Sequence, residues 1–470
     1  MKTTVLRAAV LTVLVVVPLR VIAQGYLPVD DALRHVGKAV SGRPWADVLL
    51  LRPEITLDSN PGWHVVLRVL HTVLGLGAVD LLVVSVVGLF LLLSLGPVLL
   101  LRRPEAWLLA LVMVGICDPW LIYRWLCGRP FLLTSAIVPL FCLAWTRLEG
   151  PRARAGWTAF AVSAALATWI HGSYYLLALP VLALLLAQRW RVALRLGGAF
   201  AVGILAGALL TGHPLGHLWQ MLLHGYLAVG VPRPTANLVS EFRPFEGHAE
   251  AVIAFVALLV WRTRQRPEAP PPWRDPAVML TAATWALGFV AARFWTDWAA
   301  PALASVAAVE LEAALERHAS SSRATAAALL AGAAVLLLST SADLQGRWSD
   351  QTQRVFLSRR NPTHVPWLPQ PGGIAYSAEM DVFYGLFFTN PDAPWKYVLG
   401  FEPAIMRPED YRVYCDIKRT KGATEAYLPW VERMRPQDRL YVVQRSNVPP
   451  SIPGLEWFQP VYAIWVGRRP

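Results

Sequence analysis

Cysteine and charge are both scarce in this chain of 470 residues, and each shortage excludes a class of protein. The four cysteines are too few for a disulfide framework, and no Cys/His spacing typical of a structural metal site occurs. Charged residues make up 16% of the chain and hydrophobic ones 55%, and the mean hydropathy of +0.43 is well above that of a soluble globular protein. The composition therefore indicates a membrane protein.

Apolar runs recur along the first 340 residues, which predicts a polytopic helical membrane domain. The first run could instead be a signal peptide cleaved after residue 23, but the later topology favours an anchor. Several runs are nearer fifteen residues than twenty, so their number is a weaker prediction than their alternation. We expect about eleven transmembrane spans, at residues 5–23, 79–101, 107–116, 131–145, 156–170, 174–187, 196–210, 250–261, 277–292, 299–315 and 324–338.

The formal net charge of +12 does not indicate a nucleic-acid partner, because the arginines stand in short clusters between apolar runs. Such clusters mark the cytoplasmic side of membrane proteins. Their alternation places the N-terminus in the cytoplasm and puts the first loop, residues 24–64, and the C-terminal segment outside it. We expect a multi-pass protein of a bacterial cytoplasmic (inner) membrane, with the lipid bilayer around residues 1–340.

Residues 341–470 have the mixed composition of a soluble domain. Segments 397–401, 440–443 and 461–466 are typical of short strands, and 425–434 is typical of a helix. The predicted fold is thus an all-α polytopic membrane domain, residues 1–340, followed by a small extracytoplasmic α/β domain, residues 341–470.

Two adjacent carboxylates, Asp30 and Asp31, follow the first predicted span directly. Charged groups at a membrane boundary are costly to desolvate, so they usually face water, a partner or a site. Residues 31–40 have the pattern of a short helix, and the two carboxylates could simply cap its N-terminus. A second amphipathic segment begins at Trp63 after a turn at residues 60–62. Two short helices along the membrane surface are therefore expected.

The order of these features resembles the GT-C superfamily of integral-membrane glycosyltransferases, in its protein-mannosyltransferase-like and lipid A aminoarabinose-transferase-like branches. The resemblance covers roughly residues 5–190 and is one of pattern. It rests on the Asp30-Asp31 pair and the helix after it, on the turn Asp58-Ser-Asn-Pro-Gly-Trp-His64, and on Gly128-Arg129-Pro130 before a middle span. The family's turn has an Asp-His-Pro-Pro-like sequence. Here Ser59 and Asn60 replace its histidine, and Gly62 replaces the second proline.

The resemblance implies transfer of a sugar from a polyprenyl-phosphate donor to a hydroxyl of a glycan, lipid or protein acceptor at the outer face, with inversion. Asp30 or Asp31 would be the catalytic base, with Asp30 favoured because it is nearer the span. The departing phosphate needs a cation, which a divalent metal could also supply as cofactor, although no metal ligands are assigned. The expected substrate-binding residues are Asp58, His64, Arg129, His171, His213 and Arg293.

Two other functions stay open. A transporter or flippase for a lipid-linked or polar substrate would line its pathway with acidic residues, usually near the middle of the membrane. The acids here gather at one face, which favours the enzyme. A scaffold that presents its C-terminal domain to envelope partners is the third alternative. Arg293 could also serve only as the helix neighbour of Asp297, and the long polar loop of residues 211–248 has the length of a functional lid.

Overall fold

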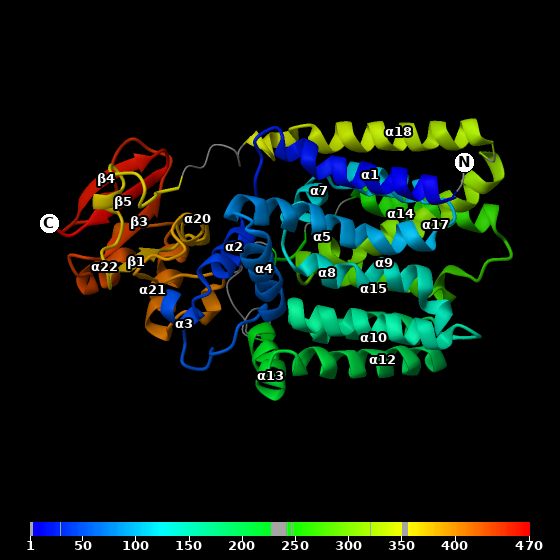
Figure 1. Ribbon diagram of the computed structural model, residues 1–470, viewed down its shortest axis with the longest axis horizontal. Coiled ribbons are helices and arrows are strands. Elements are labelled where there is room, and N and C mark those ends of the chain that lie inside the picture. Colours follow the sequence, from blue (N-terminus) through cyan, green and yellow to red (C-terminus); the bar gives the residue numbers. More distant parts are fainter. Residues whose placement is uncertain are drawn as a thin grey trace.

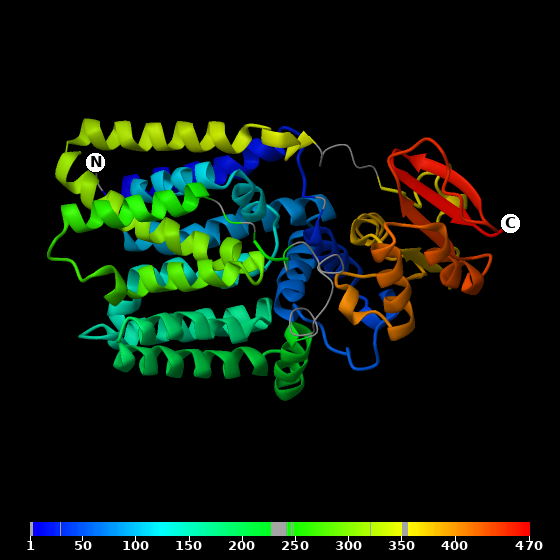
Figure 2. The same ribbon diagram turned by 180° about the vertical axis from the view of Figure 1, so that it is seen from behind.

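The protein is described here by a computed structural model that covers residues 3–28, 30–226, 241, 243–245, 247, 249–319, 321–349 and 356–470. It is mostly helical, with a bundle of roughly parallel helices at one end and a small mixed domain at the other (Figures 1 and 2). The bundle contains α1 (Thr3–Ile22), α5 (Ala78–Leu100), α6 (Glu105–Cys117), α7 (Pro119–Trp125), α8 (Phe131–Ser135), α9 (Ile137–Ala144), α10 (Ala153–Ile170), α11 (Ala178–Leu186), α12 (Trp190–Leu209), α14 (Ala249–Gln265), α15 (Pro276–Gly288), α16 (Ala292–Phe294), α17 (Ala300–His318) and α18 (Ser322–Ser341).

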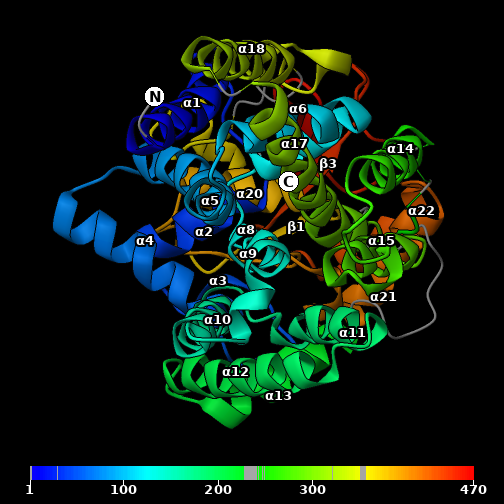
Figure 3. The same ribbon diagram turned by 90° about the vertical axis from the view of Figure 1, so that its right-hand side faces the viewer.

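Six helices of the described residues are long and apolar enough to cross a membrane, or seven if the sharply bent pair α6–α7 counts as one span. They are Thr3–Ile22, Ala78–Leu100, Phe131–Leu148, Trp190–Leu209, Ala292–His318 and Ser322–Ser341. The expected count of eleven is not confirmed. The apolar helices Tyr174–Leu186 and Pro276–Gly288 have 13 residues each, which rise only about 20 Å against about 30 Å of hydrocarbon. They nevertheless pack against each other within the bundle, as α11 and α15 (Figure 3).

Arginine clusters adjoin one end of this bundle. Helix α5 ends, α10 and α12 begin, and α14 ends on the side where the N-terminus lies (Figure 1). These ends are tied together, since Arg103 donates to the carbonyl of Ala319 at 3.1 Å and Arg317 donates to that of Gln265 at 3.1 Å. The opposite end carries the first loop and the C-terminal domain.

Helices α10 and α12 approach each other closely through small residues. A Cβ atom added to Gly203 would stand 2.2 Å from the backbone oxygen of Ala161, and one added to Gly207 would stand 2.3 Å from that of Ala165. Backbones can come this near only where side chains are small, which is a common arrangement between membrane helices.

Short helices lie across the end of the bundle that faces the C-terminal domain. In the first loop these are α2 (Asp31–Ser41), α3 (Trp45–Val48) and α4 (Pro61–Leu74), and α13 (Pro214–Gly225) follows α12. Helix α4 runs crosswise to the long helices (Figures 1 and 3). The two short helices that the sequence predicts in the first loop are thus present as α2 and α4, and their position along a membrane surface stays a prediction.

The C-terminal domain is a five-stranded mixed sheet with helices. Its strands lie in the order β2-β1-β3-β5-β4; β1 is parallel to β2 and β3, whereas β5 is antiparallel to β3 and β4. The elements are β1 (Ile374–Ser377), α20 (Met380–Thr389), β2 (Lys396–Tyr397), α21 (Pro408–Arg419), α22 (Thr424–Arg433), β3 (Arg439–Val443), β4 (Glu456–Val461) and β5 (Ile464–Arg468).

The first loop is joined to this domain by backbone hydrogen bonds. The amide of Leu50 donates to the carbonyl of Tyr397 at 3.0 Å, and that of Arg52 donates to Ile405 at 2.9 Å. Helix α2 packs on α20. The loop and the domain, more than 300 residues apart in sequence, therefore form one folded unit over the end of the bundle.

Candidate functional site

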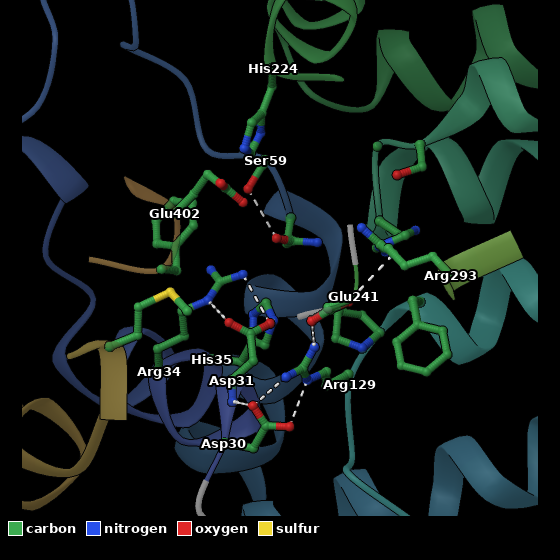
Figure 4. A pocket seen from close by; sticks show the side chains of 18 of the residues that line it. Asp30, Asp31, Arg34, His35, Ser59, Arg129, His224, Glu241, Arg293 and Glu402 are labelled. Atoms are coloured by element: carbon green, nitrogen blue, oxygen red, sulfur yellow. Dashed lines mark hydrogen bonds and ion pairs between the residues drawn. The ribbon is translucent and has the colours of Figure 1, made fainter. Parts of the chain in front are cut away.

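A polar cavity of about 290 Å³ lies where the first loop, the helix ends and the C-terminal domain meet (Figure 4). Ionisable side chains from all three regions line it. The bundle and its loops contribute Arg129, His171, His224, Glu241 and Arg293, the first loop contributes Asp30, Asp31, Arg34 and His35, and the C-terminal domain contributes Asp381, Tyr384 and Glu402.

Asp30 caps α2 and also forms a two-point ion pair. Its Oδ1 accepts a hydrogen bond from the backbone amide of Asp31 at 2.6 Å. The Nε of Arg129 donates to its Oδ2 at 2.9 Å, and Nη2 of Arg129 pairs with its Oδ1. The predicted capping role and a place in the cavity are therefore both observed for Asp30, and both of its oxygens are engaged.

Glu241 extends this ion pair into a network, seen at the right of Figure 4. It pairs with Nη1 of Arg129, lies 2.9 Å from Nη2 of Arg124, and lies 3.5 Å from Nε of Arg293. Burial alone would raise the pKa of Glu241, but the three guanidinium groups hold it well below its ordinary value. Arg293 also donates to Asp297 at 3.2 Å. The expected pairing of these helix neighbours is thus present, and Arg293 faces the cavity as well.

Asp31 is held by a different set of partners. Nη2 of Arg34 donates to its Oδ2 at 3.1 Å, and Nε of Arg34 pairs with its Oδ1. The Nε2 of His35 lies 3.2 Å from Oδ2. Burial alone would raise the pKa of Asp31, but the guanidinium of Arg34 holds it well below the ordinary value. The guanidinium of Arg34 lies 4.0 Å from the ring of Phe401, so the C-terminal domain helps to fix this group.

The remaining predicted residues divide into three groups. Arg129, His171 and Arg293 line the cavity, as the substrate-binding hypothesis requires. Asp58 and His64 do not line it but stand behind His35. His213 is exposed at the start of α13 and does not line the cavity, so its assignment as a phosphate cation is not supported.

Ser59 and Asn60, which stand where the similar GT-C turn has a histidine, belong to the turn of residues 58–64. Asn60 donates to the carbonyl of Ile170 at 3.2 Å and so holds the turn against the end of α10. Asp58 accepts a hydrogen bond from the amide of Asn60 at 3.0 Å. The second of these contacts is typical of an Asx turn. Ser59 lines the cavity.

Sequence reasoning missed several cavity residues. Arg34 and His35 lie three and four positions after Asp31, a spacing that places them beside it on a helix. That signal was available. Glu241 and the residues of the C-terminal domain follow no local pattern. The predicted lid at residues 211–248 is described only in part, because residues 227–240, 242, 246 and 248 lie outside the described part of the chain.

A divalent metal does not fit the side chains seen here. Within the described residues, no three His, Cys, Asp or Glu side chains form a group that could hold a metal ion. Asp30, Asp31 and Glu241 each face an arginine instead. Positive charge in the cavity is therefore supplied by guanidinium groups.

Comparison with known proteins adds no family to this description. The chain matches no protein-family model and no curated protein, so the chemistry of the cavity is the ground on which its function has to be argued.

Proposed function

We propose that this protein is a GT-C-type membrane glycosyltransferase. It transfers a sugar from a polyprenyl-phosphate donor to an acceptor hydroxyl, with inversion at the anomeric carbon. The observation that carries the proposal is the cavity itself: ionised carboxylates and three lining arginines, Arg34, Arg129 and Arg293, gathered at the end of an apolar helical bundle.

This placement suits a donor with one polar and one apolar part. Guanidinium groups bind phosphate through paired hydrogen bonds, and Arg129 and Arg293 stand together on Glu241. A phosphate bound there would leave its prenyl chain free to lie along the bundle in lipid. The same two arginines would stabilise the negative charge that develops on the departing phosphate.

Asp31 is the better candidate for the base, although its position in the sequence favoured Asp30. An arginine holds each carboxylate at both oxygens, Arg34 on Asp31 and Arg129 on Asp30. Asp30 also caps α2, so we assign it to positioning Arg129. Asp31 is ionised at neutral pH and lines the cavity. Its carboxylate would accept the hydroxyl proton as the acceptor oxygen attacks the anomeric carbon from the face opposite to the phosphate.

The arginine-rich end of the bundle would face the cytoplasm, as positive-inside orientation requires. The cavity and the C-terminal domain then lie at the outer face of a bacterial cytoplasmic membrane. The acceptor, a glycan, a lipid or a protein, would reach the cavity from the extracytoplasmic side.

The test measures sugar transfer in membranes that contain the full-length protein. A panel of labelled polyprenyl-phosphate sugars is offered, and label in glycan, lipid and protein fractions is counted. Asp31→Asn should lower the rate roughly 100-fold or more at normal expression. Asp47→Asn, the same charge change on an exposed residue of the same loop, should transfer at the wild-type rate. If Asp31→Asn instead abolishes movement of a lipid-linked substrate across proteoliposomes and no transfer occurs, the protein is a transporter and the proposal is wrong.

A further inference from the structure

Four side chains form a continuous row that leads from the cavity into the first loop. Asp31 Oδ2 lies 3.2 Å from Nε2 of His35, and Nδ1 of His35 lies 2.9 Å from Nε2 of His64. Nδ1 of His64 lies 2.5 Å from Oδ2 of Asp58. Asp31 and His35 line the cavity, whereas His64 and Asp58 stand behind them. The row links α2 to α4, and its two histidines are 29 positions apart in the sequence.

The hydrogens of this row can be counted. An ionised carboxylate only accepts, so Nδ1 of His64 carries the hydrogen that reaches Asp58. Nε2 of His64 is then an acceptor, and Nδ1 of His35 carries the hydrogen between the two rings. Nε2 of His35 is left bare, opposite the carboxylate of Asp31.

The structure agrees with this count. Among the described residues, Nε2 of His35 is a buried atom that has no hydrogen-bond partner. Burial and the nearby Arg34 lower the pKa of His35 to about 3, and burial lowers the pKa of His64, so both rings are neutral at rest. The row thus has three junctions but two hydrogens, and the vacancy adjoins the carboxylate proposed as the base.

We propose that Asp31, His35, His64 and Asp58 form a proton store that takes up the acceptor's proton during sugar transfer. This inference rests on the proposed function. The acceptor O–H bond breaks as its oxygen bonds to the anomeric carbon, and the phosphate leaves with the electron pair of the broken C–O bond. The proton reaches Asp31 and passes to Nε2 of His35.

His35 then gives the hydrogen of its Nδ1 to Nε2 of His64. His64 becomes an imidazolium that keeps its Nδ1 hydrogen on ionised Asp58, whose pKa His64 holds well below the ordinary value. One proton has entered, Asp31 is ionised again, and all three junctions are filled. When the products leave, the proton returns along the same path to water in the emptied cavity, which restores the starting tautomers.

Asp58→Asn is an informative test because it places a hydrogen at every junction of the row before any proton has been taken up. The amide oxygen of the new side chain can still accept from the amide of residue 60, which Asp58 binds at 3.0 Å. Its NH2 group faces Nδ1 of His64 and donates to it. Both rings must then carry their hydrogen on Nε2, so Asp31 already receives one and the row cannot take up another.

The store predicts a specific kinetic effect. In Asp58→Asn, kcat should fall about tenfold or more, with KM for the donor unchanged and a larger solvent deuterium isotope effect on kcat. His64→Gln, which interrupts the row, should show the same loss. Asp47→Asn and His71→Gln are the matched controls, since both lie outside the row and the cavity, and should keep the wild-type kcat. Wild-type kcat and isotope effect in Asp58→Asn would overturn the store.

A second measurement needs no substrate and separates the two proposals. The 15N spectrum of histidine-labelled protein reports which ring nitrogen carries hydrogen. Both His35 and His64 should be Nδ1–H tautomers in the wild type and Nε2–H tautomers in Asp58→Asn. Nε2–H rings in the wild type would disprove the vacancy. Absence of transfer by the wild-type protein with every donor would instead disprove the transferase function, and leave the tautomer prediction to be decided by the spectrum alone.

Discussion

Arg129→Met should destabilise the protein through one orphaned carboxylate. Methionine keeps much of the arginine's length and apolar contact but removes the guanidinium. Asp30 has both oxygens on Arg129, and the two side chains are only 14% and 16% exposed. Glu241 loses one partner but keeps Arg124 and Arg293. The free energy of unfolding should therefore fall by the amount typical of a buried ion pair that has lost one partner. We expect about 3 kcal/mol, at the lower end of the range for such pairs, because some water reaches this one.

The assay is the thermal unfolding midpoint of the detergent-solubilised protein, followed by tryptophan fluorescence. Arg129→Met should lower the midpoint at pH 7. Arg102→Met is the control, since that side chain is 86% exposed and its nearest acidic contact, Glu316, lies 3.9 Å away; no shift is expected. An unchanged midpoint for Arg129→Met would refute the assignment of Asp30 to Arg129.

Further predictions concern helix packing and acid stability. Gly207→Ala should lower the free energy of unfolding by about 1–3 kcal/mol, and with it the unfolding midpoint. The added methyl group would stand 2.3 Å from the carbonyl oxygen of Ala165. Gly198→Ala on the same helix meets nothing within 4 Å in the described structure, so the same assay should show no loss. The wild-type protein should lose stability as pH falls below about 6.5, because burial lowers the pKa of His35 to about 3 and the unfolded chain then binds a proton that the folded one excludes. A midpoint that is flat between about pH 7 and pH 4.5 would contradict this.

Composition and hydropathy were sufficient to predict a set of apolar helices followed by a small mixed domain, but not the number of helices long enough to span a membrane. The 13-residue helices Tyr174–Leu186 and Pro276–Gly288 are apolar too, so hydropathy alone does not separate them from helices long enough to span a membrane. In the C-terminal domain, the helix expected at 425–434 is α22, Thr424–Arg433, and the strand expected at 440–443 is β3, Arg439–Val443.

The expected strand at 461–466 shows a limit of pattern analysis. The segment contains a tight turn between β4 and β5, where Ala463 has a φ of 64°. Hairpin turns with positive φ usually carry asparagine or glycine. The turn residues here, Tyr462 and Ala463, are neither asparagine nor glycine, so the turn has no local sequence signal. Pairing of β4 with β5 evidently imposes it.

The candidate site was predictable where chemistry is local and unpredictable where it depends on tertiary structure. Asp30 and Asp31 stand out because carboxylates at the end of a span are costly. His213 and His224 look alike in sequence, but they lie at opposite ends of α13, and only His224 lines the cavity. The direction in which α13 leaves the bundle decides between them, and hydropathy does not encode that direction.

Charge balance explains why Glu241 could not be found from its neighbours in sequence. Its reason for being acidic is the approach of Arg124, Arg129 and Arg293 from three other segments. Partly buried arginines without counterions would be strongly destabilising, so a cluster proposed to bind phosphate has to carry internal carboxylates while it is empty. A phosphate would have to compete with Glu241 for the same guanidinium groups, because that carboxylate stays attached to the chain. The desolvation of the arginines is already met by folding, so the binding cost of the proposed donor would come from this competition and not from burial of the guanidinium groups.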